Sequence, residues 1–257
     1  MSTTELAGRR VLVTGAAVRI GRELALALLA RGAHVAVHYH RSVEAAQTLR
    51  AEAWTSGARC VLVRGDLRQA DAPARIVAEA ADGLGGLDAV VNNASVFRRT
   101  PLDELDDTTW DEHLQVNLTA PLRICRAALP YFEAAGGGKI VNMVDLSALR
   151  PWPSYLAHSV SKAGLLALTR GLARALARRG VQVNAVMPGI VLWPDDLDAA
   201  ERARLRRRIP VGVEGTPQDV VQAVLYLLQA SAFVTGTCVV VDGGAHLVDG
   251  GQPGGLP

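Results

Sequence analysis

The stretch Val-Leu-Val-Thr-Gly-Ala-Ala-Val-Arg-Ile-Gly at residues 11–21 decides the fold of this chain. It opens with an apolar, β-branched run of the kind found in buried parallel strands. After Gly21 the pattern becomes helical, with apolar residues at helical spacing from Leu24 onward. Small residues between a strand and a helix let backbone N–H groups and the helix N-terminus approach a phosphate. The stretch therefore predicts a strand–turn–helix anion site in the first βα unit of a dinucleotide-binding sheet.

The turn departs from the common three-glycine pattern at one position. Its spacing is Thr14-Gly15-x-x-x-Arg19-x-Gly21, so arginine occupies the place of the middle glycine. A cation at the start of a helix meets the unfavourable positive end of the helix dipole. We therefore expect Arg19 to face an anionic partner, the alternative being a solvated residue at the helix start.

Length and composition favour one large α/β domain and exclude several other classes of protein. The chain has 257 residues, 49% of them apolar, and a net charge of +2, which gives no strong field for nucleic acid or an anionic membrane. Its three cysteines, Cys60, Cys125 and Cys238, are scattered and show no CxxC spacing, as in the reduced thiols of a cytoplasmic protein. No apolar run reaches the ~20 residues of a membrane span, and residues 1–8 lack the apolar core of a signal peptide. No His or Cys cluster has metal-ligand spacing. We expect a cytoplasmic enzyme with no metal, membrane or nucleic-acid partner.

Short apolar runs alternate with helical segments, which is the pattern of βαβ units. Strands are expected at residues 10–14, 34–39, 59–64, 89–92, 139–143, 182–186 and 238–241. Helices are expected at residues 22–30, 43–56, 72–82, 108–117, 121–134, 155–179 and 217–229. The predicted fold class is α/β, a single Rossmann-type, doubly wound parallel sheet of seven strands with helices on both faces. It spans residues 1–248, with a substrate lid at about 190–216, and the Gly- and Pro-rich residues 249–257 form a flexible tail.

The residues after the second expected strand discriminate between nicotinamide cofactors. A sheet that selects NAD usually places Asp or Glu there for the ribose 2′-hydroxyl, and none stands here until Glu44. His40, Arg41 and Ser42 instead offer donors that suit a 2′-phosphate. The sequence therefore predicts NADPH rather than NADH, the alternative being a solvated turn.

Two further strand ends offer cofactor contacts. Asp66 and Leu67 follow the third strand and supply a hydrogen-bond acceptor and an apolar contact for adenine. Asn93, Ala94 and Ser95 follow the fourth strand, where small residues let a ring system lie against the backbone. Open α/β sheets bind ligands at these carboxyl ends.

Several short motifs occur in the order and spacing of the short-chain dehydrogenases/reductases. They are Thr14-Gly15…Gly21, Asn92-Asn93-Ala94, Asn117, Lys162, Pro188-Gly189 and Asp242-Gly243-Gly244. The chain is similar to that family over almost its whole length. It resembles the pteridine reductase branch most closely, on the strength of Arg19, His38-Tyr39-His40-Arg41-Ser42, Phe97 after Asn-Ala-Ser, Asn142–Asp145 and Thr235–Cys238.

The resemblance implies NADPH-dependent hydride transfer to a pterin stacked between the nicotinamide and Phe97. It implies that Asp145, where most relatives carry serine, bonds the pterin or relays a proton. The implied cofactor-binding residues are Gly15, Arg19, Ile20, Gly21, Tyr39, His40, Arg41, Ser42, Asp66, Leu67, Asn93, Ala94, Ser95, Lys162, Pro188, Gly189 and Ile190. The implied substrate-binding residues are Arg19, Ser95, Phe97, Asp145, Tyr155 and Trp193, and the implied catalytic residues are Asn117, Asp145, His158 and Lys162. Small-molecule substrates and a homotetramer are also implied.

The tyrosine that the family places four residues before its lysine is missing. There the ammonium lowers the pKa of a phenol on the same helix face. Here the position holds His158, and Tyr155 matches a pocket-wall tyrosine of the pteridine reductases. One hypothesis makes His158 the proton donor, with Lys162 lowering its pKa and Asp145 raising it. The other makes the chain a catalytically weakened NADP(H)-binding module.

A third interpretation is reduction of a carbonyl such as a 3-oxoacyl thioester, since the fold accepts many substrates. Asp145 argues against it, because an ionised carboxylate repels a developing oxyanion. In the lid, Trp193 and Trp152 are candidates for the pocket wall. The arginines at 202, 204 and 206–208 form either a solvated face or contacts to an anionic substrate tail.

Overall fold

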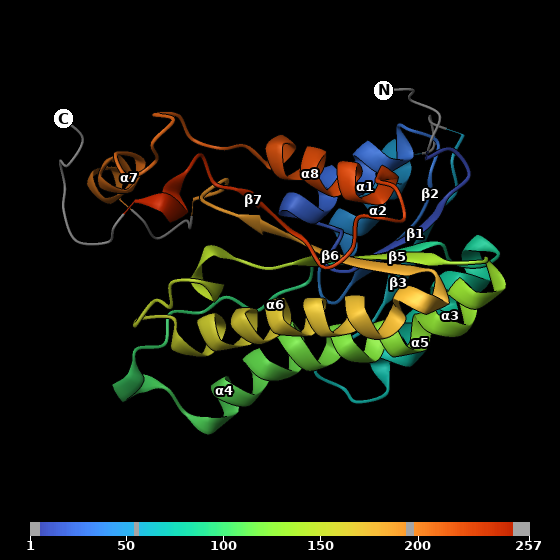
Figure 1. Ribbon diagram of the computed structural model, residues 1–257, viewed down its shortest axis with the longest axis horizontal. Coiled ribbons are helices and arrows are strands. Elements are labelled where there is room, and N and C mark those ends of the chain that lie inside the picture. The colour runs from blue at the N-terminus through green and yellow to red at the C-terminus, as the bar shows by residue number, and fades with distance from the viewer. Residues whose placement is uncertain (1–5, 54–56, 194–197, 249–257) are drawn as a thin grey trace.

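A parallel sheet forms the centre of the molecule. The computed structural model describes residues 6–53, 57–193 and 198–248, and in them seven strands form one sheet in the order β3-β2-β1-β4-β5-β6-β7 (Figure 1). Every neighbouring pair is parallel. The strands are β1 Arg10–Val13, β2 His34–Tyr39, β3 Cys60–Arg64, β4 Ala89–Asn92, β5 Gly138–Met143, β6 Val181–Pro188 and β7 Cys238–Val241. The predicted fold class is confirmed.

Helices cover both faces of the sheet, as expected of a doubly wound fold (Figure 1). One face carries α1 Arg19–Leu29, α2 Val43–Ala53 and α8 Pro217–Gln229. The other carries α3 Ala72–Leu84, α5 Ala120–Ala134 and α6 Leu156–Leu176, with α4 Asp107–Leu114 beside α6. The short α7 Ala199–Arg206 lies within the expected lid.

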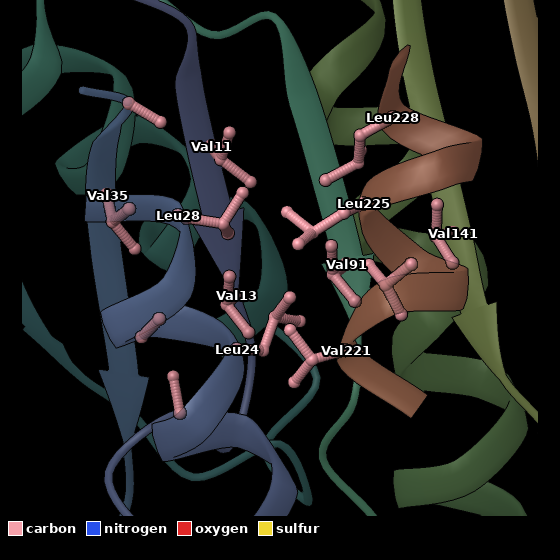
Figure 2. Close-up of a cluster of buried hydrophobic side chains, with 14 of the residues drawn as sticks. Val11, Val13, Leu24, Leu28, Val35, Val91, Val141, Val221, Leu225 and Leu228 are labelled. Atoms are coloured by element: carbon pink, nitrogen blue, oxygen red, sulfur yellow. The ribbon is translucent and has the colours of Figure 1, made fainter. Parts of the chain in front are cut away.

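Successive side chains of β1 point to opposite faces of the sheet, so each layer of helices packs on its own hydrophobic cluster. Val11 and Val13 pack with α1 and α8, whereas Leu12 packs with α3 and α5 on the opposite face. Figure 2 shows the first of these clusters, where Leu24 and Leu28 of α1 meet Leu225 of α8 over the sheet. Each such side chain, fully buried, stabilises the fold by roughly 1.5–3 kcal/mol before entropy is counted.

The structure differs from the sequence prediction at several boundaries. The helix expected at residues 43–56 ends at Ala53, and residues 54–56 lie outside the described part, as does the expected tail at 249–257. The helices expected at 108–117 and 121–134 are joined by a π-helical turn, Gln115–Thr119, which the apolar pattern did not reveal. Of the described helices, none is long and apolar enough to cross a membrane.

The order of the strands indicates where on the sheet a ligand would bind. β1 lies between β2 and β4, so the chain winds outward in opposite directions from this point. Such a reversal leaves a crevice beyond the carboxyl ends of the central strands, and ligands of open α/β sheets bind there. The loops after β1, β2, β4 and β5 all open toward this crevice.

Candidate functional site

The glycine turn after β1 is hydrogen-bonded to the residues that follow β4. The Thr14 hydroxyl accepts hydrogen bonds from the backbone N–H groups of Asn93 and Ala94, each at 3.0 Å. In return the Asn93 amide donates to the carbonyls of Thr14 and Gly15 at 2.9 and 3.0 Å. Gly15 has a φ of 61°, and a Cβ there would lie 2.9 Å from Ala94 Cα. The turn therefore tolerates only glycine at this close approach.

Arg19 adopts the left-handed conformation that the missing glycine would favour. Its φ of 54° makes it the one non-glycine residue of the described chain with a positive φ. An L-residue in that region costs roughly 1–2 kcal/mol. The side chain is exposed and lines the cleft described below. A strained, exposed arginine at a helix start is the kind of outlier that marks a ligand contact.

Two substitutions separate the strain at Arg19 from its charge. Arg19→Gly removes both, so it is expected to raise the free energy of unfolding by about 1 kcal/mol and to weaken NADPH binding. Arg19→Ala removes the guanidinium but keeps the strain, so it is expected to weaken binding equally without the gain in stability. Chemical denaturation and calorimetric titration measure the two effects. Wild-type affinity in both variants would show that the guanidinium does not bind the cofactor.

The residues predicted to bind the 2′-phosphate lie at the end of β2, next to the glycine turn. Tyr39, His40, Arg41 and Ser42 line the same cleft, and that run contains no carboxylate. The carboxylate of Asp66, the predicted hydrogen-bond acceptor for adenine, already accepts hydrogen bonds within the protein. Arg68 donates to both of its oxygens at 2.7–3.0 Å. This pairing lowers the pKa of Asp66 to about 2. Sequence analysis missed Arg68, which follows Asp66 by only two residues.

Three aromatic side chains form one wall of the cleft. The rings of Phe97 and Tyr155 stack with centroids 4.6 Å apart and an angle of 14° between their planes. Trp152 meets both rings edge to face at 6.4 and 6.0 Å. Phe97 nevertheless remains 44% exposed. Tyr155 therefore backs the Phe97 ring while leaving it open to the cleft, as a stacking platform for a flat ligand requires.

Asp145, His158 and Lys162 come together at the floor of the cleft. His158 Nε2 lies 3.9 Å from Asp145 Oδ1, and Lys162 Nζ donates to the Met143 carbonyl at 2.8 Å. Burial lowers the pKa of Lys162 to about 8, and burial also raises the pKa of the Asp145 carboxyl. The three side chains line the same cleft.

His158 is held as a neutral ring. Its Nδ1 lies 3.1 Å from the Val96 carbonyl, which only accepts, so Nδ1 carries the proton. Nε2 is buried without a hydrogen-bond partner, and burial together with the Lys162 charge lowers the pKa of the ring to about 3. The sequence left the sign of this shift open. In the free protein at neutral pH, His158 therefore presents a lone pair to the cleft rather than a proton.

Asn117 supports the site from below. It lies in the π-helical turn, is buried, and does not line the cleft. Its amide donates to the Val96 carbonyl at 3.0 Å and accepts from the Val96 N–H at 2.8 Å. Val96 is thereby fixed where it orients His158. Asn117, which the resemblance implied to be catalytic, therefore contacts Val96 and does not line the cleft.

A single cleft of about 1150 Å³ gathers the remaining predicted residues. It is lined by all of the predicted cofactor- and substrate-binding residues, from Gly15 to Trp193, and by Asp145, His158 and Lys162. The segment expected to be a lid contributes Ile190, Val191, Leu192, Trp193, Leu205 and Arg208. The Trp193 indole N–H bonds the Glu214 carboxylate, which lowers the pKa of that carboxyl. Arg98, Arg99 and Glu112 also line the cleft, although sequence analysis did not single them out.

Comparison with known proteins finds relatives over almost the whole chain. The family model adh_short_C2, described as enoyl-(acyl carrier protein) reductase, matches residues 15–246. A 3beta-hydroxysteroid dehydrogenase 1 from Eggerthella lenta is 35% identical, over 97% of this chain and 98% of the relative. A 3-oxoacyl-[acyl-carrier-protein] reductase from Synechocystis sp. is 32% identical, over 94% and 98%.

Solved structures include a protein with the same architecture and a bound nucleotide. FolM alternative dihydrofolate reductase 1 from Brucella canis, complexed with NADP, superposes with a TM-score of 0.88. It is 29% identical, and the alignment covers 96% of this chain and 97% of the other. The short-chain dehydrogenase/reductase fold binds a nicotinamide cofactor. The chain belongs to the short-chain dehydrogenase/reductase family of oxidoreductases.

Proposed function

We propose that this protein is an NADPH-dependent reductase of a pterin substrate. The observation that carries the proposal is the pairing of the open Phe97 ring with the Asp145 carboxyl on the walls of one cleft. A flat aminopyrimidine ring offers a face for Phe97 and N–H donors for Asp145. The NADP-bound FolM relative, a dihydrofolate reductase by name, supports the same substrate class.

NADPH is the proposed cofactor because the residues around the adenosine end suit a phosphate. His40, Arg41 and Ser42 line the cleft directly after β2, where an NAD-selective sheet would carry a carboxylate. The Arg19 guanidinium lines the same cleft at the glycine turn. These cations and donors favour a dianionic 2′-phosphate over a hydroxyl.

The proton route that fits the geometry runs through Asp145. When bound, NADPH would supply a hydride to a carbon of the substrate, and the adjacent ring nitrogen needs a proton. Burial favours the protonated form of Asp145, which can donate that proton, whereas the bare Nε2 of His158 can only accept a hydrogen bond. Lys162, which interacts electrostatically with Asp145, is the group that can return the proton.

The test is NADPH oxidation in the presence of dihydrobiopterin. Wild-type protein is expected to reduce the pterin, with a rate that falls as the pH rises through about 8, where Lys162 loses its proton. Asp145→Asn keeps the shape but cannot donate a carboxyl proton, so it is expected to lower the rate about 10²–10⁴-fold. Its dissociation constant for NADPH is expected to remain unchanged. Pterin reduction by Asp145→Asn at the wild-type rate would refute the proton route, and no turnover by wild type would refute the substrate.

A carbonyl or 3-oxoacyl reductase is the second candidate. The Synechocystis relative, a 3-oxoacyl-[acyl-carrier-protein] reductase, favours it by name. The bare Nε2 of His158 gives a carbonyl oxygen no hydrogen bond, so protonated Asp145 would have to supply the donor. The same NADPH assay with a 3-oxoacyl ester in place of the pterin decides between the two substrate classes.

We also propose a homotetramer in the cytoplasm. Phe233 is 99% exposed, and all four residues of β7 at the edge of the sheet stay partly exposed. Apolar surface of this kind is where a second subunit would pack in the arrangement that the family resemblance implies. The thiols of Cys60, Cys125 and Cys238 are free, as in a reducing compartment.

A further inference from the structure

We propose that His38 is a positioning residue for the cofactor, whose neutral imidazole holds the glycine turn at a fixed distance from the end of β3. The proposal rests on the proposed function only in that a nicotinamide nucleotide lies in the cleft. His38 lies on β2, is 2% exposed, and is the one buried polar side chain of that strand.

His38 binds the glycine turn with both its backbone and its side chain. The backbone carbonyl accepts from the Ala16 N–H at 2.8 Å, and the ring Nδ1 accepts from the Gly15 N–H at 3.2 Å. Two consecutive amides of the turn are thus bonded to one residue of the neighbouring strand. On its other side, the ring Nε2 lies 3.2 Å from the Gly65 carbonyl, directly after β3.

Only one form of the ring satisfies both contacts. The Gly15 N–H can only donate and the Gly65 carbonyl can only accept, so Nδ1 is bare and Nε2 carries the proton. A second proton on Nδ1 would face the Gly15 N–H. Burial lowers the pKa of His38 to about 4, with the charges of His40 and Arg75 lowering it further and that of Asp66 raising it. The ring therefore stays neutral, and its two hydrogen bonds stay intact, near neutral pH.

His38 connects the three parts of the predicted nucleotide site. Gly15 belongs to the pyrophosphate turn, and Gly65 immediately precedes Asp66 at the adenine end. The 2′-phosphate run begins two residues after His38, at His40. Because the Gly15 N–H is bonded to His38, it is not a phosphate donor in this conformation. Its contribution to binding is the geometry of the turn, and His38 sets that geometry.

Three substitutions of His38 test the two hydrogen bonds separately. His38→Asn places an oxygen near the position of Nδ1 and retains the acceptor for Gly15. His38→Gln reaches toward the position of Nε2 and retains only the donor to Gly65. His38→Leu keeps the bulk and loses both. All three are measured by calorimetric titration with NADPH and with NADH, alongside thermal unfolding.

The expected result is rescue by asparagine alone. His38→Gln and His38→Leu are expected to weaken NADPH and NADH alike by about fivefold or more, as for the loss of one buried hydrogen bond. His38→Asn is expected to keep nearly wild-type affinity even where its unfolding temperature falls. Wild-type affinity in a folded His38→Gln or His38→Leu protein would overturn the proposal.

A second measurement needs no bound nucleotide. Hydrogen exchange of the Gly15 amide is expected to be slow in wild type and His38→Asn and fast in His38→Gln. Nitrogen-15 spectra of wild type are expected to show a pyridine-type Nδ1 and a pyrrole-type Nε2 for His38. Equal Gly15 exchange in the two variants, or the opposite tautomer, would overturn the proposal. Absence of nucleotide binding by wild type would instead refute the proposed function, and the exchange data would then decide the role of His38.

Discussion

Replacing His158 by tyrosine is expected to raise the rate of carbonyl reduction about 10²–10⁴-fold, the range that a general acid contributes. The wild-type ring offers only a lone pair, because Nδ1–H is bonded to the Val96 carbonyl and the pKa of the ring lies near 3. A phenol at this position presents an O–H instead. The buried Lys162 ammonium, one helical turn away, would lower the pKa of that phenol.

The substitution is expected to cost little structurally. The Val96 carbonyl loses the His158 donor but keeps the Asn117 amide at 3.0 Å, so it remains paired. The edge-to-face contact between His158 and Phe97, with centroids 4.8 Å apart, suits a six-membered ring as well. His158→Tyr should therefore fold and bind NADPH as wild type does.

His158→Phe is the matched control. It has the same ring as His158→Tyr without the hydroxyl, so any gain that depends on proton donation must be absent. Steady-state rates with a 3-oxoacyl ester, and dissociation constants for NADPH, are measured for all three proteins. A phenol variant that binds NADPH normally and gains nothing over the phenylalanine control would contradict the account of His158. It would favour the interpretation of the chain as an NADP(H)-binding module.

A feature of the site could be predicted from the sequence when residues close to it in the chain determine it. A feature that depends on contacts between residues far apart in the chain could not be predicted. The glycine turn and the run after β2 are local, and both line the cleft at the strand ends where strand periodicity and the carboxyl-end rule locate them. The direction in which the pKa of His158 shifts is not determined by neighbouring residues in the sequence. It requires the Val96 carbonyl, 62 residues away in the chain, and a degree of burial that only packing defines.

Other features were hidden for different physical reasons. The left-handed backbone of Arg19 was signalled only by the glycine that the common pattern places there, since arginine itself rarely adopts this conformation. The π-helical turn around Asn117 is one residue wider than the helical pattern allows, and apolar spacing does not resolve it. His38 did carry a signal, namely a polar residue inside an apolar strand. Its role became evident only when the amides that meet its ring were known.

The other large effect is expected from Gly21→Ala, which should weaken nucleotide binding more than about tenfold. Gly21 lies in α1 with an ordinary helical φ, so alanine meets no backbone strain and its helix propensity is better by about 1 kcal/mol. The obstacle is steric. A Cβ there would lie 2.3 Å from the Gly15 carbonyl oxygen, 2.6 Å from Asn93 Nδ2 and 2.9 Å from Ala16 Cα.

These contacts leave the turn no direction in which to relax. The Gly15 carbonyl accepts from Asn93, which also holds Thr14, so displacement of the turn breaks its attachment to β4. Overpacking of this kind typically lowers stability by about 1–3 kcal/mol. The affinities for NADPH and NADH are both expected to fall more than about tenfold, a loss of about 1.4 kcal/mol or more.

Gly171→Ala is the matched control, because it isolates helix propensity from the steric clash. Gly171 lies in α6, and a Cβ there meets nothing within 4 Å. Gly171→Ala is therefore expected to gain up to about 1 kcal/mol of stability with nucleotide affinity unchanged. In denaturant titrations the stabilities of the two variants should therefore move in opposite directions from wild type, and in calorimetric titrations only Gly21→Ala should lose nucleotide affinity. Normal NADPH affinity in a folded Gly21→Ala protein would mean that the pyrophosphate does not lie against this turn, and the cofactor placement on which the site depends would be wrong.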